Sequence, residues 1–322
     1  MRMRSRVVHL VLSALAATFV TFGSARALAA QEVEPGHEIT KKLGPVDIIM
    51  PHITDSKHIE YPCLHSMQEW ACEATLPTWH VTIGEHTYDF GPTKHVVFLF
   101  LAALVTAVVL IGTARAHVRA SKAVGHPKGF AAGIEGVILY LRNEIFLPAI
   151  GHGGERLVLF PLTLFFFILF CNLFGLMPYG ATPTGNLSVT ATLAIITFLV
   201  VEITGMRTLG KGYISTIIYW PHDVPIGIRA GLTLIMSPME LMGKFIKPFA
   251  LTIRLFANMI GGHVVILAFI GLIFMFGFKI AIFPWFMALC IMGLEILVAL
   301  IQAFIFALLS SVFIGQLRVA HH

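Results

Sequence analysis

The chain has 322 residues, of which 57% are hydrophobic and only 12% are charged, and it carries several apolar runs of membrane-spanning length. These values exclude an ordinary soluble domain and indicate a polytopic membrane protein. The formal net charge is +5, but the basic residues lie mainly in short segments beside apolar runs, where they orient helices in a bilayer, so the charge does not indicate nucleic-acid binding.

The first 30 residues have the pattern of a secretory signal. Three arginines precede a short apolar core, and the small-residue pattern Ala27-Leu28-Ala29 follows it. We interpret residues 1–30 as a signal peptide, with an uncleaved membrane anchor as the alternative. Both interpretations place residues 31–94 outside.

Residues 31–94 mix Pro, Gly, His and charged residues without sustained periodicity, which predicts an irregular periplasmic extension with little structure of its own. Cys63 and Cys72 lie in this extension, and because its compartment permits disulfides we predict a Cys63–Cys72 bridge. The spacing of its histidines matches no metal-site pattern, so we predict solvated loop histidines and no metal centre.

The next segments predict three membrane crossings and one surface helix. The first crossing covers about 95–113 and is followed by basic residues, which the positive-inside tendency places in the cytoplasm. Residues 130–150 carry apolar residues at helical spacing beside charged ones, which predicts an amphipathic helix on the inner surface. Two further crossings cover about 157–177 and 187–205, with a turn rich in Pro and Gly between them.

The last two apolar segments are too long for upright crossings. They cover about 228–278 and 280–316, whereas about 20 residues cross a hydrocarbon core of about 30 Å. We expect them to tilt steeply, to bend or to begin along the interface. The predicted fold is therefore an all-α polytopic membrane protein with five transmembrane helices in residues 95–322, a periplasmic mature N-terminus and a cytoplasmic C-terminus.

The first of these long segments contains polar residues at membrane depth, which are functional candidates because contact with lipid would cost several kcal/mol. Arg254 and Asn258 are four residues apart and share one helix face, and Glu240 lies near a whole number of turns before them. His263 is about half a turn out of phase with Arg254, so it is expected to face away from it.

The last segment contains Glu295 and Gln302, which are seven residues apart and stack on one helix face. We assign no function to Lys244 and Lys247 of the preceding long segment, because we expect their side chains to extend to the inner membrane interface.

Structural explanations compete with functional ones for these side chains. A salt bridge from Arg254 to Glu295 or Glu240 would lock the two segments together. Asn258 and Gln302 could join helices through hydrogen bonds without a part in transport. Glu240 could be a solvated acid at the interface.

These residues resemble subunit a of the F-type ATP synthase membrane sector. The resemblance covers about residues 95–318 and rests on RLFANMIGGH at 254–263, EILVALIQAF at 295–304, MSPMELMGKFIKPFALTIRLFANM, and NLFGLMPYGATPTGNLSVTATLA at 172–194. It implies two long tilted helices that pack as a hairpin along a rotating ring of c subunits, each of which carries one membrane carboxylate.

The resemblance also implies roles for single residues. The family's essential arginine falls on Arg254, and its hydrogen-bonding partner from the last helix falls on Gln302. The family's proton-path residues fall on Glu240, Asn258, His263 and Glu295. In some bacterial members the acid precedes the histidine of the pair, so here the two residues are exchanged between the helices.

The function implied by the resemblance is that of a non-catalytic stator subunit of the bacterial inner membrane, which provides two half-channels for ions to the ring. The His263 and Glu295 pair favours H⁺ over Na⁺. The implied partners are the c-ring, the subunit b peripheral stalk, the rest of the F1F0 complex and the lipid membrane. No cofactor, metal or nucleic acid is expected.

The alternative function is a secondary transporter that binds an anionic substrate at Arg254. This alternative predicts an internal repeat of broken helices, but the RLFANM pattern has no second copy. An intramembrane enzyme is less favoured still, because the chain contains no HExxH and no GxSxG pattern.

Overall fold

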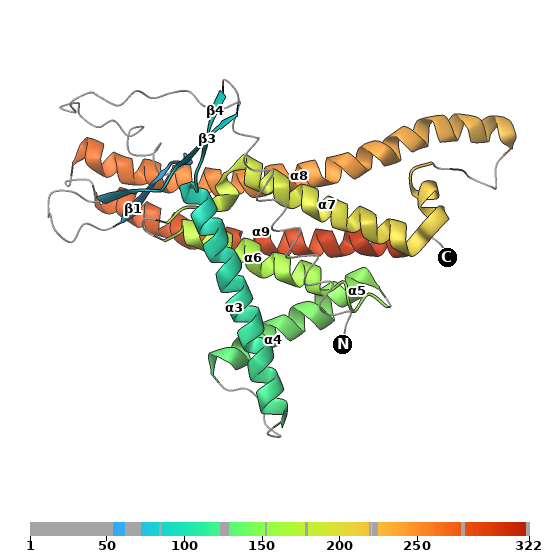
Figure 1. Ribbon diagram of the computed structural model, residues 1–322, viewed down its shortest axis with the longest axis horizontal. Coiled ribbons are helices and arrows are strands. Elements are labelled where there is room, and N and C mark those ends of the chain that lie inside the picture. Colours follow the sequence, from blue (N-terminus) through green and yellow to red (C-terminus); the bar gives the residue numbers. More distant parts are fainter. Residues whose placement is uncertain are drawn as a thin grey trace.

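A computed structural model describes residues 54–61, 72–83, 86–122, 129–151, 153–177, 180–218, 220, 225–277 and 281–319. This part of the chain is mostly helical (Figure 1). The α-helices are α3 (Lys94–Lys122), α4 (Phe130–Tyr140), α5 (Leu147–Ile150), α6 (Leu159–Gly175), α7 (Leu187–Leu209), α8 (Ile226–Phe276) and α9 (Ile282–Val319). A π-helical turn, η2 (Leu141–Phe146), joins α4 to α5, and the 3₁₀ turns are η3 (Pro183–Gly185) and η4 (Gly210–Thr216).

The apolar helices have the lengths that a multi-pass membrane protein requires. Within the described residues, four helices are long and apolar enough to cross a membrane: α3, α7, α8 and α9. A fifth apolar helix, α6, is shorter. Each segment that the sequence predicted as a crossing falls on one of these five helices, and residues 130–150 are helical as predicted.

The described part of the outer extension is not irregular, so that prediction was wrong. It contains β1 (His58–Tyr61) paired antiparallel with β2 (Cys72–Thr75), and β3 (Trp79–Ile83) paired antiparallel with β4 (His86–Phe90). In the second pair Trp79 lies opposite Phe90 and Val81 lies opposite Tyr88. Each strand has only four or five residues, which is too short to show a sustained sequence period. The fold is therefore mostly helical, consistent with an all-α polytopic membrane protein to which two short strand pairs are added.

Two sequence predictions fall on residues that the structure does not describe. The signal segment, residues 1–30, lies outside the described residues. Cys63, one of the two cysteines of the predicted Cys63–Cys72 bridge, also lies outside the described residues.

The two long helices α8 and α9 pack side by side and run in opposite directions (Figure 1). α8 has 51 residues, which corresponds to a length of about 75 Å, and it contains Pro238 and Pro248. Its first turns extend beyond the ends of α7 and α9 (Figure 1). The excess length predicted from the sequence is therefore present as one long helix.

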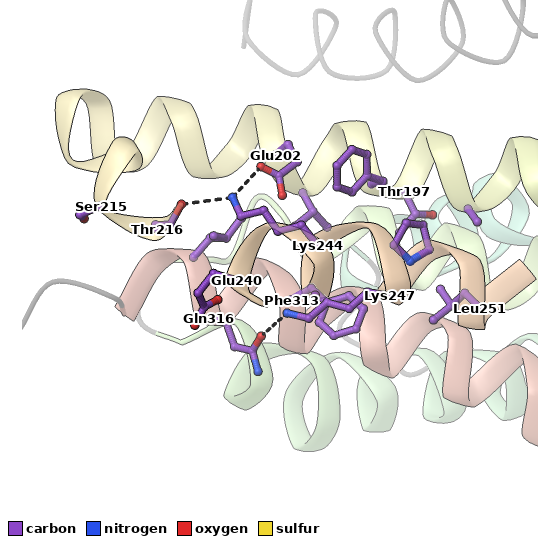
Figure 2. A pocket seen from close by; sticks show the side chains of 16 residues that line it. Thr197, Glu202, Ser215, Thr216, Glu240, Lys244, Lys247, Leu251, Phe313 and Gln316 are labelled. Atoms are coloured by element: carbon purple, nitrogen blue, oxygen red, sulfur yellow. Dashed lines mark hydrogen bonds and ion pairs between the residues drawn. The ribbon is translucent and has the colours of Figure 1, made fainter. Parts of the chain in front are cut away.

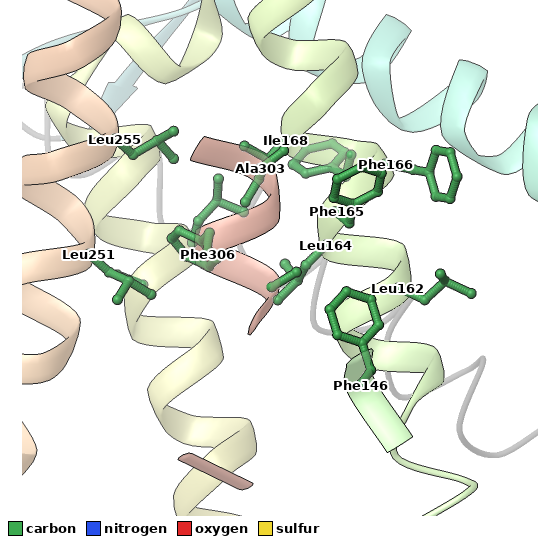
Figure 3. Packing of buried hydrophobic residues seen from close by; sticks show 14 of the residues in the cluster. Phe146, Leu162, Leu164, Phe165, Phe166, Ile168, Leu251, Leu255, Ala303 and Phe306 are labelled. Atoms are coloured by element: carbon green, nitrogen blue, oxygen red, sulfur yellow. The ribbon is translucent and has the colours of Figure 1, made fainter. Parts of the chain in front are cut away.

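The buried core lies where α6, α8 and α9 meet. Figure 3 shows Ala303 and Phe306 of α9 between Phe165 of α6 on one side and Leu251 and Leu255 of α8 on the other. Alanines on one face of α9, including Ala303, are completely buried, and such small side chains let helices approach closely. This packing fixes the mutual register of the three helices that carry the candidate site.

Candidate functional site

Arg254 lies near the middle of α8 with its side chain exposed, on the same exposed face as Asn258. The buried residues Leu255 and Met259 lie about 100° further around the helix and point into the bundle. The common face that the four-residue spacing predicted is therefore confirmed. The arginine is carried on the outside of the bundle, where another molecule can reach it.

No carboxylate in the described part of the chain forms an ion pair with Arg254. The structural alternative, a salt bridge from Arg254 to Glu240 or Glu295, is therefore wrong. Glu295 is buried and Glu240 lies about 20 Å away along α8. Gln302 is also buried, and no hydrogen bond joins it to Arg254 among the described residues.

The surface around Arg254 is apolar. Large side chains of α8 and α9 stand uncovered by the rest of the described chain: Phe249, Ile253 and Val265 on α8, and Leu297, Leu300 and Ile301 on α9. In a membrane protein such side chains contact lipid or a partner subunit. An unpaired guanidinium in apolar surroundings is costly in lipid, which favours a partner that supplies negative charge.

His263 and Glu295 form a buried pair between α8 and α9, as the sequence predicted. Nδ1 of His263 lies 2.5 Å from Oε1 of Glu295, and Glu295 is only 2% exposed. Gly262 is required beside the pair, since a Cβ atom there would lie 2.7 Å from the same carboxylate oxygen. His263 faces into the bundle, away from Arg254, as its helical phase predicted.

The partners of His263 show where its protons lie. Nε2 of His263 is 2.8 Å from the carbonyl oxygen of Gly175, and because a carbonyl can only accept, this nitrogen carries a hydrogen. Nδ1 faces the Glu295 carboxylate and the carbonyl oxygen of Met259, which lies 3.1 Å away. The contact between Nδ1 and Glu295 is a hydrogen bond when one proton lies between the two atoms, and either side chain can donate that proton.

Hydrogen bonds among three polar side chains fix the turn between α6 and α7, beside the pair of His263 and Glu295. Thr184 donates a hydrogen bond of 2.6 Å to Oδ1 of Asn172, whose Nδ2 donates to the carbonyl oxygen of Ala299 at 3.2 Å. Thr182 in the same turn places its Oγ1 3.0 Å from Nε2 of His263. Sequence reasoning assigned no role to these three side chains, since their partners are distant in sequence.

A larger cavity lies toward the other end of α8, between α7, α8, α9 and η4 (Figure 2). Its volume is about 310 Å³, and its polar lining residues include Glu240, Glu202, Lys244, Lys247 and Gln316. Glu240 is separated from His263 by 23 positions, or about 35 Å along the helix. The two polar sites therefore lie well apart on α8, and Arg254 lies between them in sequence.

Lys244 is a structural residue of this cavity, contrary to the expectation that it only extends to the interface. Its Nζ donates to Oε2 of Glu202 at 3.2 Å and to Thr216 at 3.1 Å (Figure 2), and also to Tyr213 at 3.1 Å. Tyr213 also donates to Glu202. This network was not predicted because Glu202 and Lys244 lie 42 positions apart on different helices.

We expect Lys244→Met to destabilise the subunit by about 3 kcal/mol, because removal of one member of a largely buried ion pair leaves the other charge uncompensated. The double variant Lys244→Met/Glu202→Leu should regain most of this loss, since apolar side chains replace both charges. The thermal unfolding midpoint of the purified protein measures both effects.

Lys247→Met is the matched control. Lys247 is exposed, donates to the neutral Gln316 at 3.2 Å and lies 4.7 Å from the ring centre of Phe313, so within the described residues its loss breaks no ion pair and should change stability by about 1 kcal/mol or less. A double variant less stable than Lys244→Met alone would contradict the ion-pair explanation.

Comparison with known proteins agrees with this arrangement. The ATP synthase A chain family model matches residues 96–315. The chain belongs to this family. The ATP synthase A chain family match covers part or all of each of the five apolar helices, and Glu240, Arg254, His263 and Glu295 lie within it.

Individual relatives are similar over most of their length. ATP synthase subunit a of Anaeromyxobacter dehalogenans is 43% identical over 298 residues, which cover 90% of this chain and 73% of that protein. ATP synthase subunit a 2 of Chlorobaculum tepidum is 39% identical over 319 residues, which cover 98% of this chain and 82% of that protein. ATP synthase subunit a of Chloroherpeton thalassium is 45% identical over 266 residues, which cover 76% of this chain and 77% of that protein. The ATP synthase A chain family therefore includes relatives that also align with the outer extension.

Proposed function

We propose that this member of the ATP synthase A chain family is the proton-translocating stator subunit of the F-type ATP synthase membrane sector. In this proposal α8 and α9 lie as a tilted hairpin against the c-ring. The observation that carries the proposal is Arg254, an exposed cation without an acidic partner among the described residues, set on α8 between two separate polar sites.

Arg254 would act on the carboxylic acids of the ring. A ring acid that arrives opposite a fixed cation is favoured in its ionised form, so it releases its proton there. Because a guanidinium keeps its own proton at any physiological pH, Arg254 would also prevent a direct proton leak between the two aqueous paths. Gln302 and Asn258 would position the arginine or the water around it.

The outer half-channel would use the pair of His263 and Glu295. The proton shared between their facing atoms gives the pair two states of similar geometry, one with the charges separated and one neutral. A proton can therefore pass through the pair without a large rearrangement. Histidine is also the side chain whose charge changes most readily near neutral pH.

The inner half-channel would begin at the cavity that Glu240 lines. Its volume of about 310 Å³ accommodates several water molecules, since each occupies about 30 Å³ in the liquid. Glu240 would receive protons released near Arg254 and pass them to the cytoplasm. This assignment places the C-terminus in the cytoplasm and the mature N-terminus in the periplasm of a bacterial inner membrane.

The energetics favour a rotary device with several protons per product. One charge that crosses a membrane potential of 100 mV yields about 2.3 kcal/mol, which is too little for one costly synthesis step. ATP synthesis itself would take place elsewhere in the F1F0 complex. The subunit b stalk would connect that catalytic part to this non-catalytic subunit.

The alternative, a secondary transporter with an anion bound at Arg254, is less well supported. Such sites are enclosed near the midplane between repeats, whereas Arg254 lies on an outer face of the described bundle. We retain the stator proposal for this reason.

Cysteine cross-linking tests the proposed ring contact. We expect Ile253→Cys to form disulfides with a cysteine placed near the carboxylate of the ring subunit, because Ile253 is exposed beside Arg254. Leu255→Cys, on the buried side of the same turn, is the matched control and should form none. Purification as a particle without small proteolipids, together with substrate uptake, would instead support the transporter.

A further inference from the structure

His95 is a buried titratable residue that the function described above does not use. It lies in the first turn of α3 and is 3% exposed. Its backbone N–H donates to Oδ1 of Asp55 at 3.3 Å, and its ring Nδ1 lies 3.4 Å from the same oxygen. Within the described residues Nδ1 has no hydrogen-bond partner. Buried polar atoms are usually satisfied, so this nitrogen requires an explanation.

A small pocket joins His95 to the proposed outer half-channel. It has a volume of about 20 Å³, and its polar lining side chains are those of His95, Thr182 and His263. A pocket of this size holds about one water molecule when several polar groups line it. Beyond the pocket, Nδ1 of His263 is 2.5 Å from Glu295. Titratable groups therefore follow one another from Asp55 to Glu295.

We propose that Asp55 and His95 form the entrance of the outer proton path and deliver protons through this pocket to His263 and Glu295. This inference rests on the proposed function. Asp55, whose side chain is 28% exposed, collects a proton from the outer solution. His95 accepts one proton on its Asp55 side and gives one up toward the pocket, so its charge is unchanged after each transfer.

The surroundings of His95 are suited to this transfer. Burial disfavours lasting retention of a proton on the ring and the neighbouring Lys94 adds to this effect, whereas Asp55 attracts a proton toward the ring. The titratable groups on the far side of the pocket are His263 and Glu295. His95 can thus gain and lose a proton without becoming a trap.

A purely structural role is the competing explanation, since Asp55 also binds a free backbone N–H in the first turn of α3. Two conservative variants separate the roles. His95→Gln keeps a polar side chain but cannot carry a proton. Asp55→Asn keeps an oxygen that accepts the backbone hydrogen bond but removes the negative charge.

The test measures ATP synthesis by the whole complex in membrane vesicles, driven by acidification of the outer side and normalised to assembled complex. We expect His95→Gln to lower the rate about tenfold, less than the 10²–10⁴-fold of a direct acid–base group because water can partly substitute. Asp55→Asn should lower it less, and both should alter the dependence on outer pH. Imidazole added on the outer side should partly restore His95→Ala.

His117→Gln is the matched control, since His117 lies on the same helix and its side chain is 58% exposed. The rate of ATP synthesis of this variant should equal that of the wild type. A wild-type rate for His95→Gln, beside a damaged His263→Ala, would overturn this inference and leave the proposed function intact. A slow His95→Gln with an unchanged pH profile and no effect of imidazole on His95→Ala would also overturn it. A wild-type rate for His263→Ala would instead count against the proposed function.

Discussion

Replacement of Arg254 by lysine is expected to abolish coupled ATP synthesis, with a fall of about 10²-fold or more, as when a fixed electrostatic group is removed from a reacting site. The arginine is exposed on an apolar surface, and no acid of the described chain neutralises it. An ammonium group in the same place can lose its proton when water is excluded, and it lacks the planar fork that matches a carboxylate.

ATP-driven proton pumping in membrane vesicles, normalised to assembled complex, provides the measurement for Arg254→Lys. Arg207→Lys is the matched control, since this arginine is exposed in the last turn of α7, and the same change there should leave pumping normal. Normal pumping by Arg254→Lys would refute the role proposed for the guanidinium.

The second large effect is expected at the pair of His263 and Glu295. Each single alanine variant should lose most of the proton-translocation rate, and the double variant should be little worse than the more damaged single one. The non-additive part should correspond to a coupling energy of about 0.5–3 kcal/mol, as for residues in direct contact. The reason is the direct contact between the two side chains, with Nδ1 of His263 2.5 Å from Oε1 of Glu295.

Two consecutive steps of one path can also give non-additive rates without any contact, so an exchange variant completes this test. In His263→Glu/Glu295→His the same two groups face each other from opposite helices. We expect its rate to exceed that of either His263→Glu or Glu295→His alone, because the pair can again share a proton. No recovery, combined with additive alanine effects, would count against a common relay.

The parts of the site that the sequence predicted are those with a local pattern. The spacing of Arg254 and Asn258 determined their common face because a helix has a fixed period. The phase of His263 likewise predicted that it turns away from Arg254, and the structure places it against Glu295. The excess length of the last two segments was also a local property, since it follows from counting apolar residues.

The parts that the sequence did not predict depend on tertiary contacts. Glu202 and Lys244 meet only because α7 and α8 pack together. His95 looked like the first residue of an apolar run, and only the approach of Asp55 and of the turn between α6 and α7 makes it a candidate relay. The strands of the outer extension were missed because each has only four or five residues.

The shortness of α6 has a consequence for the electric field. Its 17 residues span about 25 Å, less than the hydrocarbon thickness of about 30 Å, so a bilayer beside it must become thinner to avoid hydrophobic mismatch. The helix ends at Gly175, whose carbonyl oxygen binds His263. The same voltage applied across a thinner insulating layer gives a steeper gradient, and that gradient would be concentrated next to His263, the residue for which we propose a role in proton transfer.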